Sequence, residues 1–204
     1  MTRHHPLGAL GHECAHNVYI LENNVIQKNF SPVGFGTEES PIKIYIANRP
    51  PIDDYPRMNE LRGLVPGEID HIVRHTSNHW RKVFNVYAKF LFNWENSRET
   101  ATGMTDLPDT WQTYRDTRLF QPASIAALLF STPQVHAKHS TFHLVAGKTY
   151  AATLDLPPLT WLDNHFAINE NHRVIVTPYP DYRQLSNARI ATLIALMETV
   201  SQRT

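Results

Sequence analysis

Thr141-Phe-His-Leu-Val-Ala146, followed by Gly147-Lys-Thr-Tyr150, is the first of two stretches that decide the fold. The second is Arg173-Val-Ile-Val-Thr177, followed by Pro178-Tyr-Pro-Asp-Tyr-Arg-Gln-Leu-Ser186. Each is a short apolar run that stops at a turn and then changes to a helical pattern. Two consecutive strand-loop-helix units predict neighbouring parallel strands in an α/β sheet. Because ligands bind at the carboxyl ends of such strands, both loops are candidate parts of a site.

Two further strands are predicted before these units. In Ile42-Lys-Ile-Tyr-Ile-Ala47, isoleucine recurs at every second position, as in a strand with one buried face, and two prolines soon end the run. Ser124-Ile-Ala-Ala-Leu-Leu-Phe130 is an apolar run of strand length, although a helix also fits it. The alternation over residues 42–200 predicts a three-layer α/β/α domain with a four-stranded, mainly parallel sheet.

Helix start signals lie between the strands. Pro66-Gly-Glu-Ile-Asp70 begins one helix with acids in its first turn, and Thr76-Ser-Asn78 begins a second. Asp109 or Thr110 caps a third, short helix. Residues 95–109 have no apolar periodicity and are predicted to form a loop.

The second of these helices carries aromatic residues at helical spacing. Trp80, Phe84 and Tyr87 lie on one side of a helical projection, which predicts a buried stripe. Arg81 and Lys82 are then expected to face water.

Composition favours a single globular domain. Hydrophobic residues make up 42% of the 204-residue chain and charged residues 19%, which excludes a disordered protein. Residues 1–40 lack periodicity and are predicted to be an irregular N-terminal arm, and residues 41–204 a single α/β domain. Since no apolar run is long enough to span a bilayer and no secretory signal is recognisable, we expect a cytoplasmic protein with no membrane partner.

The charge balance bears on possible partners. The formal net charge is zero, with twelve histidines counted as neutral. Proteins that bind nucleic acid mainly through electrostatics are usually clearly basic, so the composition argues against that class. A local basic face on a neutral chain is still compatible with nucleic-acid binding.

His12-Glu-Cys-Ala-His16 matches the zinc motif H-E-x-x-H, in which two imidazoles on one helix face hold the metal and Glu13 is the general base. The context does not support it, because Gly8 and Gly11 weaken helix initiation and no third ligand follows at a fixed offset. We therefore predict no metal site and keep a zinc hydrolase only as a third alternative.

Gly147-Lys148-Thr149 looks like the end of a phosphate-binding P-loop. That motif requires a glycine five positions earlier, where Phe142 stands within the strand. A structural turn explains the sequence better, and we predict no nucleotide cofactor.

Four landmarks occur in chain order: Ile44-Tyr-Ile-Ala-Asn48-Arg-Pro-Pro51, Asn78-His-Trp-Arg-Lys-Val-Phe84, His143-Leu-Val-Ala-Gly147-Lys-Thr-Tyr-Ala151 and Val174-Ile-Val-Thr-Pro178-Tyr-Pro-Asp181. They resemble motifs of the uracil-DNA glycosylase superfamily, especially its mismatch-specific branch: a strand ending in Gly-x-Asn-Pro-Gly, an Asn-Arg-Phe-Trp-Lys helix, a strand before Gly-Lys, and a final strand with a Pro-x-Pro-Ser loop. The strings Asn-His-Trp-Arg, Ala-Gly-Lys-Thr-Tyr-Ala and Asp-Tyr-Arg-Gln-Leu-Ser also resemble an uncharacterised bacterial domain family with no assigned activity.

The glycosylase resemblance implies cleavage of an N-glycosidic bond in a base flipped out of the duplex. It implies that Asn48 orients the attacking water and is the catalytic residue, and that residues 177–182 contact the minor groove. The residues expected to bind substrate are Asn78, His79, Gly147, Thr177, Tyr179 and Arg183.

The sequence departs from the glycosylase motifs at both ends of the predicted site. Around Asn48, the flanking glycines of the motif are replaced by Ala47, Arg49, Pro50 and Pro51. Asp181 in the last loop is expected to repel phosphate. Asp53 or Asp54 offers an alternative carboxylate base, although a solvated turn also explains this pair.

Two functions therefore precede the zinc hydrolase. The first is a divergent DNA glycosylase, a hydrolase of DNA repair that acts on a modified or mismatched base and needs no cofactor. The second is a non-catalytic nucleotide- or protein-binding domain on the same fold.

Overall fold

The structure is a computed structural model that describes residues 31–102, 106–136 and 140–202. The described residues from Pro32 onward belong to one compact unit, which is described below. The zinc motif, His12 to His16, and all but the last ten residues of the predicted arm lie outside the described residues.

Four parallel strands form the centre of the sheet. In order across the sheet they are β4 (Ala126–Leu129), β2 (Ile42–Tyr45), β5 (Phe142–Ala146) and β8 (Val174–Thr177). They are the four strands that the sequence predicts. The parallel α/β core is therefore confirmed, and Ser124–Phe130 contains a strand rather than a helix.

The full sheet is larger than predicted. Four strands of two or three residues extend it: β1 (Gly34–Phe35), β3 (Leu61–Arg62), β6 (Thr160–Trp161) and β7 (Ala167–Asn169). The order is β3-β1-β4-β2-β5-β8-β7-β6. Because β1 pairs antiparallel with β4, and β7 with β8, the sheet is mixed. The prediction of four strands was wrong because segments this short carry no alternation; their neighbours specify the pairing.

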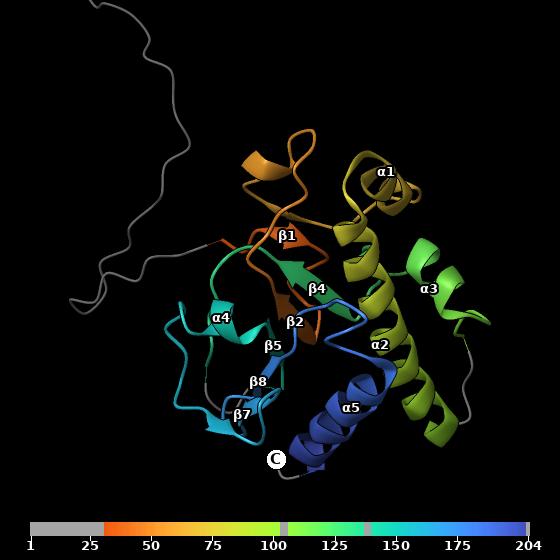
Figure 1. The fold of residues 1–204 in the computed structure, drawn as a ribbon. Helices are drawn as coiled ribbons and strands as arrows, with labels where there is room; N and C mark the ends of the chain where they lie inside the picture. Colours follow the sequence, from red (N-terminus) through yellow and green to blue (C-terminus); the bar gives the residue numbers. More distant parts are fainter. Residues whose placement is uncertain (1–30, 103–105, 137–139, 203–204) are drawn as a thin grey trace, which may run out of the picture. The chain divides into compact units, whose positions relative to one another are not determined.

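One face of the sheet carries the long helices. They are α1 (Glu68–His75), α2 (Asn78–Thr102), α3 (Trp111–Thr117) and α5 (Asn187–Gln202). Figure 1 shows α2 and α5 beside the sheet, with α1 and α3 on the far side of α2. The predicted stripe of Trp80, Phe84 and Tyr87 is buried in the core on this face, which confirms it.

The opposite face has a thinner cover. Tyr45, Val145 and Val176 point to this side and pack with Tyr150 and Leu154. The only helix in that cluster is α4 (Lys148–Ala151), a single turn. The second outer layer of the predicted α/β/α sandwich thus consists, in the described chain, of one helical turn with irregular chain around it.

Helix α2 is longer than the sequence suggests, since it continues to Thr102 through residues predicted to be loop. Its last turns lie beyond the apolar stripe, so periodicity gives no signal there. The guanidinium of Arg98 lies 5.0 Å from the centre of the Trp94 ring, one turn away, and this contact covers an otherwise exposed edge of a core residue.

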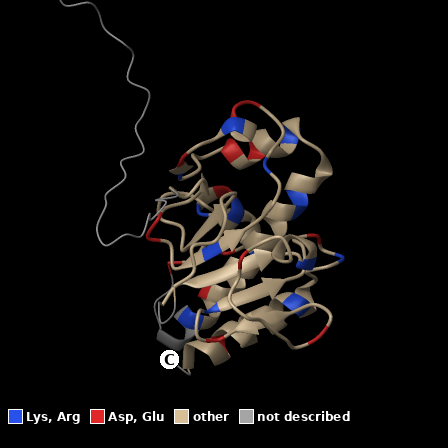
Figure 2. Cartoon of the chain, turned by 90° about the vertical axis from the view of Figure 1, so that its left-hand side faces the viewer, with Lys and Arg blue, Asp and Glu red and all other residues tan. Residues whose placement is uncertain are grey.

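Charged side chains are dispersed over the sheet edge and loops. On the side that Figure 2 turns toward the viewer, Lys and Arg alternate with Asp and Glu among mainly uncharged residues. This distribution agrees with the zero net charge and leaves no field of one sign across that side.

A buried carboxylate joins α1 to the edge of the sheet. Glu68, 8% exposed, accepts from both Arg62 terminal nitrogens at 2.5 and 3.0 Å, from the Tyr55 hydroxyl at 2.7 Å and from the Val65 backbone N–H at 2.9 Å. Burial by itself raises the pKa of Glu68, but these hydrogen bonds outweigh burial and hold the pKa below its ordinary value.

Replacing this carboxylate should destabilise the fold in a pH-dependent way. We expect Glu68→Gln to lower the free energy of unfolding by about 1–3 kcal/mol at neutral pH, because it weakens charge-assisted hydrogen bonds to buried groups. A lowered pKa stabilises the folded state above the unfolded value, and that contribution is lost as pH falls through the folded value. Urea unfolding should therefore show the variant and wild type converging in stability below pH 4.5.

Glu60→Gln is the matched control, because Glu60 is exposed and lies in the same segment. It should change stability by less than about 0.5 kcal/mol. An equal loss in both variants would contradict a special role for Glu68.

Candidate functional site

The order of the central strands places a topological switch at β2. The chain leaves β2 for β4 on one side and then crosses back to β5 on the other. Ligands in α/β sheets bind at the carboxyl ends of strands beside such a switch. Here that edge carries Asn48 after β2, Gly147 after β5 and Tyr179 after β8.

Three predicted site residues converge at this edge through one hydroxyl. Asn48 Nδ2 donates to the Tyr179 hydroxyl at 3.3 Å, and this hydroxyl lies 2.9 Å from His79 Nε2. The rings of His79 and Tyr179 stack with their centroids 5.5 Å apart. His79 comes from the first turn of α2, so the cluster joins three elements that are far apart in sequence.

Gly147 provides the floor beneath Tyr179. Its φ of +97° is a conformation that side-chain-bearing residues rarely adopt, and its backbone N–H donates to the Thr177 carbonyl at 2.8 Å. A Cβ at this position would lie 3.6 Å from Tyr179 Cδ2, in ordinary contact. The backbone conformation, rather than space under the ring, therefore requires glycine here.

The network has a preferred protonation pattern. Burial and the positive charge of Lys82 lower the pKa of His79 below 6.5, while Asp181 opposes them, so the imidazole is neutral at pH 7. Burial raises the pKa of Tyr179, so its hydroxyl keeps its proton. With Asn48 donating to this hydroxyl, the phenolic proton can point to Nε2, which places the proton of neutral His79 on Nδ1.

The loop after β8 is held against α2 by an ion pair. Lys82 Nζ lies 2.7 Å from Asp181 Oδ2, and both side chains are about one-quarter exposed, at 25% and 22%. The same carboxylate accepts from the Arg183 backbone N–H at 2.9 Å. The Lys82 hydrogen bond, followed by the Arg183 N–H, lowers the pKa of Asp181. The expected repulsion of phosphate by Asp181 is thus offset by Lys82, which the sequence analysis placed in water.

The loop after β2 is anchored by Arg49, the residue that directly follows Asn48. Arg49 Nη1 donates to the carbonyls of Pro56 and Met58 at 3.1 and 2.8 Å. Its guanidinium carbon also lies 5.7 Å from the centre of the Phe130 ring. These contacts tether the loop beside Asn48.

Three predicted site residues do not join the cluster. Asn78 is exposed, and its Oδ1 accepts from Arg81 Nε at 2.7 Å, which ties it to its own helix. Thr177 is 3% exposed, and its hydroxyl donates to the Pro178 carbonyl at 3.0 Å. Thr177 therefore stabilises the turn after β8. Arg183 is exposed on the same loop as Tyr179, with its guanidinium 5.7 Å from the Tyr182 ring centre.

The alternative carboxylates are engaged away from the network. Asp53 Oδ2 lies 2.7 Å from His71 Nε2, and Asp54 pairs with Arg57 at 2.7 Å. Among residues 31–202 that the structure describes, no group of three or more His, Cys, Asp or Glu side chains is arranged to hold a metal ion.

Sequence reasoning placed Tyr182 in the site loop but missed Lys82 as its neighbour. The signal was present, because Lys82 stands one turn after His79, but only the tertiary fold brings residues 181–182 against α2. The Lys82 ammonium lies 5.2 Å from the Tyr182 ring centre.

This unit is a mixed α/β domain with a polar cluster at the carboxyl edge of its central strands. The chain belongs to the family described as "Family of unknown function (DUF6942)", which matches residues 33–198. Searches of curated proteins and of solved structures return no match. Within the described chain, none of the helices has both the length and the apolar character needed to cross a bilayer.

The pKa of His79 reports on the charges of Lys82 and Asp181 beside it. Removing the lysine charge in Lys82→Met should raise the pKa of His79, and removing the carboxylate charge in Asp181→Asn should lower it. An NMR titration of the His79 ring would show both directions. Because the folded pKa lies below the unfolded value of 6.5, the wild type should also lose stability as pH falls from 6.5 through the folded pKa.

His136 is a suitable internal reference, because it lies in a loop of a different part of the chain. If both variants move His79 in the same direction, or move His136 equally, the arrangement of charges around His79 is wrong.

Proposed function

We propose that this protein hydrolyses the N-glycosidic bond of a modified or mismatched base in nucleic acid, with Asn48 as the residue that orients water. The observation that carries the proposal is the meeting of Asn48, His79 and Tyr179 at the carboxyl edge of the central strands. The motif resemblance to the uracil-DNA glycosylase superfamily, and the order of those motifs, support the same chemistry.

The hydrogen bond to Tyr179 orients the Asn48 amide. With Nδ2 donating to the tyrosine, Oδ1 is the acceptor that can hold a water molecule or the N–H edge of a base. Within the described residues, Oδ1 has no hydrogen-bond partner, and Asn48 is exposed. A neutral amide positions water without needing a specific pH. It also adds no positive charge beside the sugar, where positive charge develops in the transition state.

The neutral histidine suits the leaving group. A departing base carries negative charge, and a preorganised donor stabilises that charge. His79 with its proton on Nδ1 offers such a donor, and no other described residue takes up this nitrogen. In this mechanism Tyr179 positions both residues and does not react.

The proposal predicts base release that depends on Asn48. Wild-type protein incubated with single-stranded and mismatched oligonucleotides containing uracil or other altered bases should release free base, measured by chromatography. Asn48→Ala should lower the rate by about 100-fold or more, because it removes the group that positions the nucleophile.

Asn78→Ala is the matched control, since it removes the same amide from an exposed position outside the network. It should keep the rate within about threefold of wild type. Absence of base release across a broad panel, or equal losses in both variants, would overturn the proposal.

A second function is supported by one observation. The Tyr179 ring lies against Gly147 and its hydroxyl already bonds Asn48, so the chain's own aromatic ring occupies the edge of the candidate site. A non-catalytic domain that binds a nucleotide when Tyr179 moves aside fits this geometry. Saturable NMR shifts of His79 with added nucleotide, without base release, would favour this function over hydrolysis.

A further inference from the structure

A groove beside the candidate site combines cations with an exposed aromatic ring. It has a volume of about 170 Å³ and is lined by Arg81, Lys82, Asn85, Val86, Lys89 and Tyr182. The first five residues lie along one side of α2, and Tyr182 comes from the loop after β8. No carboxylate lines the groove. Its surface is almost entirely apolar, and three of its six lining residues end in a cation.

The cations of this groove retain charge for a ligand. In the described chain, neither Arg81 nor Lys89 lies within ion-pair distance of a carboxylate, whereas Lys82 is neutralised by Asp181. Arg81 and Lys89, the two groove cations outside the ion pairs of the described chain, are eight residues apart, which places their backbones about 12 Å apart along the helix axis. The charge is therefore distributed along a line, as a polyanion requires.

Aromatic rings stand at both ends of this line. Tyr182 is 54% exposed, with Lys82 and Arg183 at 5.2 and 5.7 Å from its ring centre. At the other end, the Lys89 ammonium lies 4.9 Å from the ring centre of the half-buried Trp111 on α3. Alternation of cations and aromatic faces is the pattern that holds single strands, in which bases stack while the backbone follows positive charge.

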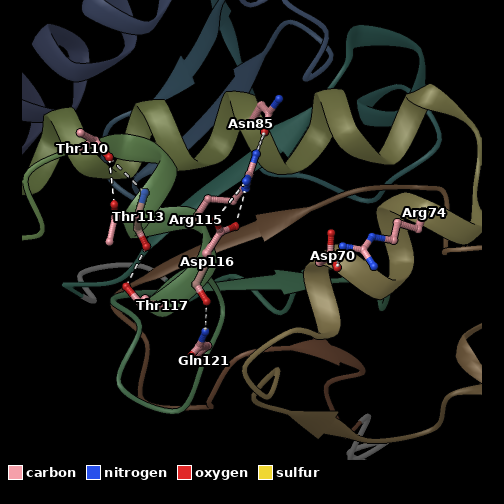
Figure 3. A network of polar contacts seen from close by, with 9 residues as sticks. All are labelled: Asp70, Arg74, Asn85, Thr110, Thr113, Arg115, Asp116, Thr117 and Gln121. Carbon is pink, nitrogen blue, oxygen red and sulfur yellow. Dashed lines mark hydrogen bonds and ion pairs between the residues drawn. The ribbon is translucent and has the colours of Figure 1, made fainter.

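A hydrogen bond joins the wall of the groove to the neighbouring helix α3. Arg115 of α3 donates from Nη1 to Asn85 Oδ1 at 2.7 Å and pairs with Asp116 at 2.7 Å, as Figure 3 shows. Thr110 caps α3 by accepting from the Thr113 N–H at 3.2 Å, as the sequence predicts. The Arg115–Asn85 hydrogen bond joins α3, which carries Trp111, to the helix that carries Lys89.

We infer that this groove binds a single-stranded nucleic acid segment that leads to the Asn48 cluster. The groove adjoins the loop that carries the cluster, because Tyr182 lines the groove three residues after Tyr179, and Lys82, which also lines it, pairs with Asp181. The inference names the substrate as single-stranded and so rests on the proposed function. An exposed ring beside cations suits unstacked bases, whereas duplex DNA hides its base faces.

Binding of a fluorescein-labelled oligothymidylate of about 20 nucleotides tests the groove, with anisotropy as the readout. With Arg81, Lys89 and Arg183 contacting phosphates, log affinity should fall against log salt with a slope of about −2. Lys89→Ala should weaken binding by about three- to tenfold and reduce this slope by about 0.7. Tyr182→Ala should weaken binding by about tenfold, and Tyr182→Phe, which keeps the ring, should restore it.

Two control variants are matched in chemistry but lie elsewhere. Arg74→Ala removes one exposed cation from α1, where Figure 3 shows it paired with Asp70, and Trp161→Ala removes an exposed ring from β6 at the sheet edge. Both should bind within about twofold of wild type. The inference would be overturned if the controls bound the oligonucleotide as weakly as the groove variants do. Tighter binding of a blunt duplex, or full competition by polyglutamate, would also overturn it.

These experiments distinguish failure of groove binding from failure of the proposed hydrolysis. Asn48→Ala should bind the oligothymidylate within about twofold of wild type, because Asn48 does not line the groove. Intact groove binding without base release from any substrate would reject the proposed hydrolysis and keep the groove. The role of the groove would be rejected, and the hydrolysis kept, if wild type and the Lys89 and Tyr182 variants released base at equal rates and bound the oligonucleotide with equal affinity.

Discussion

The parallel pairing of β2 with β4 on one side and β5 on the other is the constraint from which the rest of this structure follows. Parallel strands align their carboxyl ends at one edge of the sheet. The chain after β2, β5 and β8 must therefore leave the sheet at the same edge, and the residues just beyond these strands become neighbours. Asn48 and Tyr179 meet there although 131 positions separate them.

Helix α2 serves both the core and the site. Its buried side places Trp80, Phe84 and Tyr87 under the sheet, which sets the rotation of the helix about its axis. Once that rotation is set, the first turn delivers His79 to Tyr179 and the outer side delivers Lys82 and Lys89 to the groove. Core packing and site geometry are thus coupled through one rigid element.

The polar cluster owes its properties to partial burial. An exposed histidine would be partly charged near neutral pH, whereas His79 is held neutral by desolvation and by the adjacent ammonium of Lys82. A neutral ring can accept from the tyrosine and donate through its other nitrogen, so the cluster forms one directed hydrogen-bond network. Asp181 limits the effect of Lys82 and secures the loop that carries Tyr179.

The sequence by itself determined the four central strands, the α1, α2 and α3 start signals and the buried aromatic stripe, because each rests on local periodicity or capping. It also indicated Asn48, His79, Gly147 and Tyr179, through their places in the four motifs that resemble those of the glycosylase superfamily. Tertiary structure alone decided the two-residue edge strands, the separation of Asn78 and Thr177 from the cluster, and the pairing of Lys82 with Asp181. Those features depend on which side of an element faces a distant segment, and that choice is made by packing across the sheet rather than by neighbouring residues.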